Sequence, residues 1–209
     1  MNSRHLSFKS LAIALALLVA VGALVLWSVR PQGANNASPA GPLAGASIGG
    51  AFTLVDQDGR PATEKAFAGH YTLVYFGYTF CPDVCPLDVQ KMASALRSFE
   101  KTDPARAAKV VPVFITVDPE RDTPAALKAF VGAFHPRLVG LTGSVEQVEA
   151  AKRAYKVYAK KAGAPGATDY LVDHSAMTYL MGPDGKPISF ADHSATAEQI
   201  AADLDKYVD

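Results

Sequence analysis

The hydrophobic pattern of this chain opens with one long uncharged stretch. Residues 11–29 contain no charged side chain, and Trp27 lies near their end. As a helix they span about 28 Å at 1.5 Å per residue, which matches the hydrocarbon thickness of a bilayer. A cleaved signal peptide is the alternative, but its cleavage site needs small residues, and this stretch ends in Leu24-Val25-Leu26-Trp27. The pattern therefore predicts an uncleaved transmembrane anchor.

The charges flanking this stretch predict its orientation. Arg4 and Lys9 precede it, whereas after Arg30 no Lys or Arg occurs before Arg60. Because basic residues favour the cytoplasmic side, residues 1–10 are predicted to form a cytoplasmic N-terminus and the bulk of the chain to lie outside. The simplest setting is a bacterial inner membrane with the C-terminal domain in the periplasm, and the mitochondrial inner membrane is the alternative.

The rest of the chain divides into a tether and a folded domain. Residues 31–47 carry neither a charge nor an aromatic ring, so residues 30–47 are predicted to be a flexible linker. Residues 48–209 alternate between strand-like and helix-like patterns and are predicted to form one domain.

Within that domain, the alternation over residues 52–55 and the following Asp58-Gly59 predict an opening hairpin. Helical spacing of apolar residues predicts helices after Pro86 and from Pro124. Ser144–Gln147 and Thr196–Gln199 are capping boxes that predict the starts of two more helices. Strands are predicted over residues 71–78, 110–117, 138–141, 177–181 and 187–190.

This order of elements predicts an α/β domain with a centrally parallel sheet and an antiparallel edge. The βαβαββα order fits a thioredoxin-like fold with an N-terminal hairpin extension, preceded by one transmembrane helix. The chain carries 20 basic and 20 acidic residues. Without a basic surplus, nothing favours a nucleic-acid partner.

The two cysteines, Cys81 and Cys85, lie where the first buried strand gives way to a helix. Sites in open α/β sheets gather beyond the carboxyl ends of the strands. With Pro86 as the first helical residue, Cys85 lies at or near the N-cap, where the helix dipole and free amide groups stabilise a thiolate. Residues four apart on a helical turn have Cα atoms about 6 Å apart, so both metal ligation and disulfide exchange are open. A structural disulfide or a pair of buried thiols is the third interpretation.

A histidine is the predicted third ligand. Asp173-His174-Ser175 is expected in a polar turn before residues 177–181, and Asp192-His193-Ser194 repeats its pattern. Two thiolates and one imidazole suit Cu(I), whereas zinc usually takes four ligands. The residue pattern favours His174 over His193 only slightly. Asp118, which follows the second buried strand, is a candidate for orienting the site, although a solvated, salt-bridged loop explains it equally well.

Three segments resemble the Sco/SenC family of copper chaperones for cytochrome c oxidase. They are Phe76-Gly-Tyr-Thr-Phe-Cys-Pro-Asp-Val-Cys-Pro86, Val117-Asp-Pro-Glu-Arg-Asp-Thr-Pro124 and Tyr170-Leu-Val-Asp-His-Ser175, in the family's order. The resemblance implies a thioredoxin-like fold with Cys81, Cys85 and His174 as ligands of Cu(I) or Cu(II). It assigns no metal to His193.

The resemblance also implies two alternative functions. One is a metallochaperone without turnover, which takes copper from a donor protein and delivers it to the binuclear centre of cytochrome c oxidase subunit II or another copper-protein acceptor. The other is a thiol-disulfide reductase that keeps the acceptor cysteines reduced. The Cys-x-x-x-Cys spacing of Cys81 and Cys85 departs from the Cys-x-x-Cys of thioredoxins, which weakens the interpretation as a general disulfide enzyme.

Overall fold

The computed structural model describes residues 13, 18–22, 40–164 and 169–209. The chain divides into residues 1–36 and residues 37–209, and the second part contains the folded domain. Most of the predicted anchor, residues 11–29, and the predicted linker up to residue 39 lie outside the described residues. Within the described residues, no helix has the length and apolar character needed to cross a membrane.

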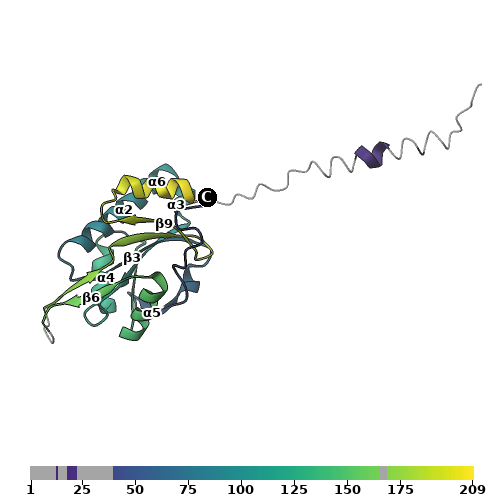
Figure 1. Cartoon of the computed structure of the whole chain (residues 1–209). Helices are drawn as coiled ribbons and strands as arrows, with labels where there is room; N and C mark the ends of the chain where they lie inside the picture. The colour runs from purple at the N-terminus through teal and green to yellow at the C-terminus, as the bar shows by residue number, and fades with distance from the viewer. Residues whose placement is uncertain (1–12, 14–17, 23–39, 165–168) are drawn as a thin grey trace, which may run out of the picture. The chain divides into compact units, whose positions relative to one another are not determined.

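The described strands form a seven-stranded sheet and a separate two-stranded ladder (Figure 1). The order in the large sheet is β2-β1-β5-β4-β3-β8-β9. β3 pairs in parallel with β4, and β4 with β5, while the outer pairings are antiparallel. The predicted parallel centre and the opening hairpin are therefore confirmed, and both edges are antiparallel. The strands are β1 (Thr53–Asp56), β2 (Pro61–Thr63), β3 (Tyr71–Gly77), β4 (Val110–Thr116), β5 (Val139–Thr142), β6 (Ala159–Ala162), β7 (Leu171–His174), β8 (Met177–Met181) and β9 (Pro187–Asp192).

The helices lie on both faces of the large sheet. Successive strand residues point to opposite faces, so Tyr75 and Phe76 of β3 identify the two sides. The Tyr75 hydroxyl bonds to Asp88 of α2, whereas the Phe76 ring packs 5.2 Å from Tyr155 of α5. α6 packs against α2, and Figure 1 shows the two side by side. The helical elements are η1 (Glu64–Phe67), α2 (Val84–Thr102), α3 (Pro104–Ala107), α4 (Pro124–Gly132), α5 (Val145–Tyr155) and α6 (Ala197–Tyr207).

The sheet centre positions the cysteine segment. Every residue of β3 is buried, and the strand ends at Gly77. A Cβ on Gly77 would lie 3.0 Å from Cys85 Sγ and 2.8 Å from the Tyr75 ring. Only a residue without a side chain lets the cysteine segment pack this closely on the end of the strand.

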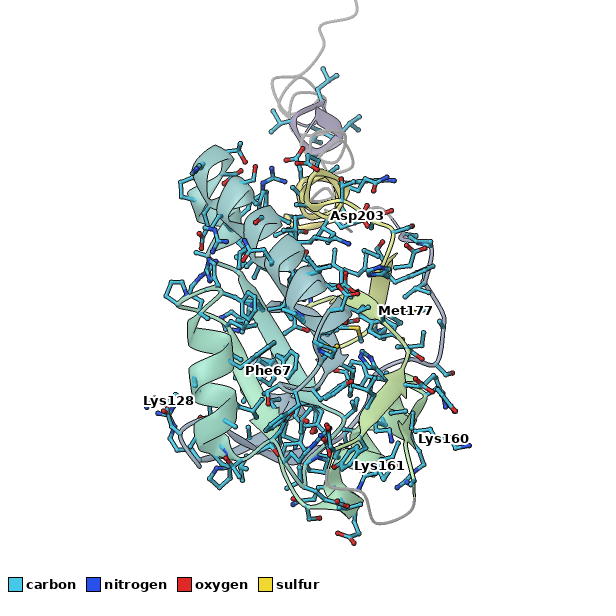
Figure 2. The ribbon with its side chains drawn as sticks, turned by 90° about the vertical axis from the view of Figure 1, so that its left-hand side faces the viewer. Phe67, Lys128, Lys160, Lys161, Met177 and Asp203 are labelled. Atoms are coloured by element: carbon cyan, nitrogen blue, oxygen red, sulfur yellow. The ribbon has the colours of Figure 1, made fainter. Side chains whose placement is uncertain are left out.

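The two-stranded ladder differs from the sequence expectation. β7 pairs antiparallel with β6, and Ala159 lies opposite His174. The predicted polar turn is therefore wrong for Asp173 and His174, which end a strand, and only Ser175 follows it. The two strands are consecutive in the chain, and the pairing uses the Ala-Lys-Lys-Ala segment of β6 (Lys160 and Lys161 in Figure 2), which carries no strand pattern of its own.

Candidate metal centre

The cysteine segment connects β3 to α2 and closes on itself. α2 begins at Val84 with Asp83 as its N-cap, so Cys85 lies inside the first turn and not at the cap itself. Pro86 is then the third helical residue. The N–H groups in this first turn have no partner within the helix, so proline, which lacks an N–H, costs no hydrogen bond there. The backbone N–H of Cys85 donates to Cys81 Sγ at 3.4 Å. This bond holds the first sulfur over the start of the helix.

His174 reaches the same segment from the end of β7. Its Nε2 lies 3.2 Å from Cys85 Sγ, and its Nδ1 lies 3.2 Å from the Ser175 carbonyl oxygen. Because a carbonyl only accepts, Nδ1 carries the hydrogen, which leaves the Nε2 lone pair directed at the sulfur. The rings of Tyr75 and Tyr78 pack against the imidazole at 6.1 and 5.9 Å, both nearly perpendicular to it. Burial lowers the pKa of His174, so the ring is neutral and able to ligate.

The two thiols have different environments. Cys85 is fully buried, and burial raises the pKa of its thiol despite hydrogen bonds from Tyr78 and Tyr75. Cys81 is partly exposed. Its partial burial raises its pKa, but the backbone N–H groups of Cys85 and Asp83 outweigh this and leave the pKa lowered. The expectation that the helix start activates Cys85 therefore does not hold for the metal-free protein, in which Cys81 is the activated thiol.

The predicted ligands are close neighbours, although their side chains do not yet form a closed site. Cys85 contacts His174 through its sulfur and Cys81 through its amide. Among the described residues, no group of three His, Cys, Asp or Glu side chains is arranged to hold a metal ion as it stands. The donors themselves, two sulfurs and an unprotonated imidazole nitrogen, are those that soft, low-coordinate ions prefer.

Asp118 lies beside the site and does not contact the sulfurs. Its buried carboxylate accepts hydrogen bonds from the Tyr170 hydroxyl at 2.7 Å and from Arg121 Nε at 2.5 Å. The Arg121 guanidinium lies over the rings of Tyr170, Phe80 and Tyr78 at 3.7, 4.9 and 5.8 Å. Tyr78 in turn packs on His174. Asp118 is thus connected to His174 only through these aromatic side chains and Arg121, and it is buried, unlike a residue of a solvated loop.

Asp122 is a structural residue that the sequence reasoning missed. It is fully buried, and its carboxylate accepts hydrogen bonds from the backbone and hydroxyl of Thr79 and from the Thr116 hydroxyl. Burial raises the pKa of Asp122 against these hydrogen bonds. The bonds tie the residue two before Cys81 to the end of β4. No local signal marks this role, because Thr79 follows β3 and Thr116 ends β4, and the two meet Asp122 only in the folded domain.

His193 belongs to a charged network around Asp88. Its Nδ1 lies 3.1 Å from Asp88 Oδ1, which also accepts from Lys91 Nζ at 3.1 Å. The other Asp88 oxygen accepts from the Tyr75 hydroxyl at 3.3 Å. His193 therefore reaches the candidate metal centre only through Asp88 and Tyr75, and contacts neither cysteine.

Comparison with known proteins identifies the family. The SCO1/SenC family model matches residues 40–209. The chain belongs to the SCO1/SenC family. It is 44% identical to the mitochondrial SCO2 homolog of Mus musculus over 164 residues, covering 78% of this chain and 64% of the relative. It is 47% identical to the mitochondrial SCO1 homolog 1 of Arabidopsis thaliana over 151 residues, covering 72% and 44%. The chain thus spans less than two thirds of these two relatives.

The similarity extends to a bacterial relative and to solved structures. The SCO2-like protein of Rickettsia conorii is 40% identical over 184 residues, covering 83% of this chain and 84% of the relative. Arabidopsis thaliana ScoI with copper bound has a TM-score of 0.70 and 41% identity, covering 76% of this chain and 97% of that one. Bradyrhizobium japonicum ScoI with copper bound has a TM-score of 0.68 and 44% identity, covering 77% and 99%. These structures confirm the mixed α/β, thioredoxin-like fold.

Proposed function

We propose that this Sco/SenC protein binds one copper ion through Cys81, Cys85 and His174 and delivers it during cytochrome c oxidase assembly. The observation that carries the proposal is the 3.2 Å contact between Cys85 Sγ and His174 Nε2, two residues from distant parts of the chain. The copper-bound Arabidopsis and Bradyrhizobium relatives support the choice of metal. BsSco, described as a member of the Sco family of cytochrome c oxidase assembly proteins, supports the biological setting.

The chemistry of the three donors fits copper as cargo. Copper entry displaces the proton of the buried Cys85 thiol, and the metal then replaces that proton as the partner of both Cys85 and His174. Cys81, which is partly exposed and whose sulfur accepts a hydrogen bond from the Cys85 amide, supplies the second thiolate. Two thiolates and one imidazole serve Cu(I) with a net charge of −1 and Cu(II) with none. Transfer then proceeds by exchange of these ligands for those of the acceptor.

The partners and location follow from the same proposal. The acceptor is the binuclear copper centre of oxidase subunit II or another copper protein, and a separate donor protein loads the site. An anchor over residues 11–29 holds the domain in the periplasm of a bacterial inner membrane. The relatives include both mitochondrial proteins and a Rickettsia protein, which is consistent with either membrane setting.

Copper titration of the full-length protein tests the ligand set. We expect one equivalent of Cu(II) to give thiolate charge-transfer absorption, and His174→Ala to weaken binding by at least tenfold. His193→Ala is the matched control, because His193 contacts Asp88 and neither sulfur. Unchanged copper affinity in His174→Ala, with the protein folded, would remove His174 from the site and end the proposal.

A thiol-disulfide reductase is the second candidate, and the unequal burial of the two cysteines favours it. The partly exposed Cys81 is placed to attack a substrate disulfide, and the buried Cys85 to resolve the mixed disulfide. The substrate then leaves as a dithiol, the protein is oxidised to a Cys81–Cys85 disulfide, and an external thiol reductant must restore it. BsSco, a 25% identical relative, is described as having a disulfide switch. Reductase activity that survives His174→Ala but not Cys81→Ser would establish this function.

A further inference from the structure

A cavity of about 310 Å³ lies on the sheet face opposite α2, away from the cysteines. Its floor is made by Thr72 and Val74 of β3 and by Val113 and Ile115 of β4. These strand residues point to the same face as Phe76, which packs on α5. Thr72 is the second residue of β3, whereas Cys81 follows the other end of that strand. The cavity and the candidate metal centre therefore lie toward opposite ends of β3.

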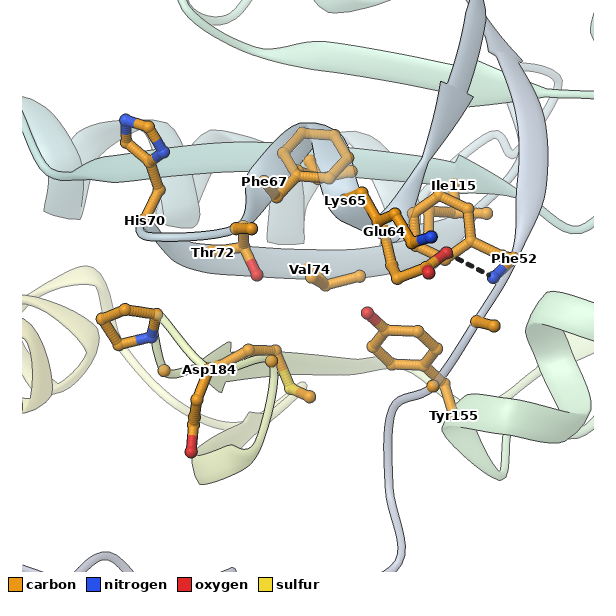
Figure 3. A pocket seen from close by; sticks show the side chains of 18 residues that line it. Phe52, Glu64, Lys65, Phe67, His70, Thr72, Val74, Ile115, Tyr155 and Asp184 are labelled. Carbon is orange, nitrogen blue, oxygen red and sulfur yellow. Dashed lines mark hydrogen bonds between the residues drawn. The ribbon is translucent and has the colours of Figure 1, made fainter.

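The walls of the cavity come from segments that are far apart in the sequence. η1 and the following residues form one wall, and the turn between β8 and β9 forms another. The backbone N–H of Gly69 donates to the Pro183 carbonyl at 2.9 Å, which joins these two walls. Residues 50–52 and Tyr155 of α5 complete the lining (Figure 3). The enclosure is thus built from hydrogen-bonded segments on a rigid sheet.

Two largely buried side chains direct hydroxyl groups into this cavity. Thr72 and Tyr155 are 7% and 6% exposed, and neither side chain makes a hydrogen bond to another described residue. Figure 3 shows the two hydroxyls directed into the cavity with Val74 between them. Burial raises the pKa of Tyr155 to about 12, so its hydroxyl remains a donor. Neither hydroxyl oxygen is among the described side-chain atoms that are buried without a partner, so both are accessible from the cavity and can bond to a ligand there.

The lining also indicates which ligand would fit. The apolar side chains Phe52, Phe67, Val74, Ile115 and Met181 suit an apolar body. Glu64 lies at the Tyr155 end, where one carboxylate oxygen accepts from the Phe52 N–H at 3.1 Å and the other has no partner in the described part of the chain. Lys65 and Asp184 also line the cavity, so charges of both signs surround it and favour a neutral ligand. The Glu64 carboxylate can accept a hydrogen bond from a ligand hydroxyl. With about 30 Å³ for each water in the liquid, the cavity has room for a compound of roughly a dozen non-hydrogen atoms.

We propose that this cavity is a binding site for a small, neutral, largely apolar ring compound with hydroxyl groups at opposite edges. The ring lies over Val74 and Ile115, and its two oxygens accept hydrogen bonds from Thr72 and Tyr155. At the Tyr155 end, the ligand hydroxyl donates to Glu64. The site is separate from the copper-binding function proposed above and does not depend on it.

The test uses 2,6-dihydroxynaphthalene as the probe and full-length protein labelled with ¹³C at the methionine methyl groups. Met181 lines the cavity, whereas Met92 is buried in α2 on the other face of the sheet and serves as an internal reference. We expect saturable shifts of the Met181 methyl signal with no change at Met92. Naphthalene, which lacks the oxygens, and naphthalene-2,6-dicarboxylate, which carries two charges, should bind at least tenfold more weakly.

Two conservative variants test the polar contacts. Thr72→Val and Tyr155→Phe each remove one hydroxyl and keep the shape of the side chain, so each should weaken the diol about three- to tenfold and leave naphthalene unaffected. Tyr207→Phe, a buried tyrosine of α6 outside the cavity, is the matched control and should bind normally. The proposal is overturned if Met181 does not shift up to the solubility of the probe, if Met181 and Met92 shift together, or if the diol binds both variants as tightly as the parent protein.

Discussion

The Tyr75 hydroxyl donates to Asp88 Oδ2 at 3.3 Å, across the interface between β3 and α2. The same hydroxyl lies within hydrogen-bonding reach of the Cys85 sulfur, and the Tyr75 ring packs edge-on against His174. Asp88 is itself held by Lys91 and His193. One buried phenol therefore connects the candidate metal centre to a charged network that reaches the surface.

Tyr75→Phe should change the copper site without removing a ligand. The variant keeps the ring against His174 but loses the hydroxyl that faces Cys85 and Asp88, so we expect a shifted Cu(II)–thiolate absorption band. The buried hydrogen bond is worth about 1 kcal/mol, and the free energy of unfolding should fall by that amount. Absorption spectra of the copper-loaded protein and urea unfolding of the metal-free protein measure the two effects. An unchanged band would place the hydroxyl outside the influence of the sulfur.

Asp118→Ala should lower the free energy of unfolding by more than is usual for a substitution in an acidic loop, because Asp118 is buried. The substitution leaves the Arg121 guanidinium and the Tyr170 hydroxyl without their buried partner. Removing one partner of a buried ion pair costs about 3–5 kcal/mol. Arg121 already lacks one hydrogen bond, because its Nη2 is buried without a partner in the described part of the protein. Urea unfolding measures the loss. Glu120→Ala, an exposed neighbour that pairs with Lys161, is the control and should cost less than about 1 kcal/mol.

The sequence predicted those parts of the fold whose signals are local. Ser144 and Thr196 each begin a helix with both reciprocal capping bonds, as their spacing indicated. The opening hairpin formed around the Asp58-Gly59 turn, in which Gly59 has φ of 79°. Each of these signals lies within a few residues of the structure that it specifies.

The features that the sequence could not predict depend on contacts between different elements of the fold. His174 lies at the end of a strand because β6, a lysine-containing segment, pairs with β7. Asp122 is buried because Thr79 and Thr116 from two strand ends close around it. The unpaired hydroxyls of Thr72 and Tyr155 share a cavity only after the sheet and α5 have packed. In each case the residue type does not reveal the role of the side chain until its partner from another element is known.

Asp122 should make stability depend on pH in an unusual direction. Burial raises the pKa of this carboxyl above its unfolded value of about 3.9, so the native state binds the proton more tightly than the unfolded chain. Its contribution is therefore fully present below about pH 4 and is lost as the pH rises through the folded pKa. The Asp122→Asn variant has no titrating group at this position. As the pH rises over that window, the unfolding free energy of the parent should therefore fall relative to that of the variant. Urea unfolding at a series of pH values measures this, and a difference that stays constant with pH would show that Asp122 titrates normally.

Gly77→Ala should test how closely the cysteine segment must approach the sheet. The added methyl group would meet Cys85 Sγ at 3.0 Å, the Tyr75 ring at 2.8 Å and the Phe114 ring at 3.1 Å, and all three of these groups are fully buried. Overpacking of this kind costs about 1–3 kcal/mol, and relief by displacement of Cys85 would also separate its sulfur from His174. We therefore expect a lower midpoint of urea unfolding together with weaker copper binding. Gly132→Ala in α4 is the matched control, because a Cβ there meets no atom within 4 Å, and it should leave both properties unchanged or raise stability slightly. Normal copper binding in a destabilised Gly77→Ala protein would show that the sulfur position tolerates displacement from the end of β3.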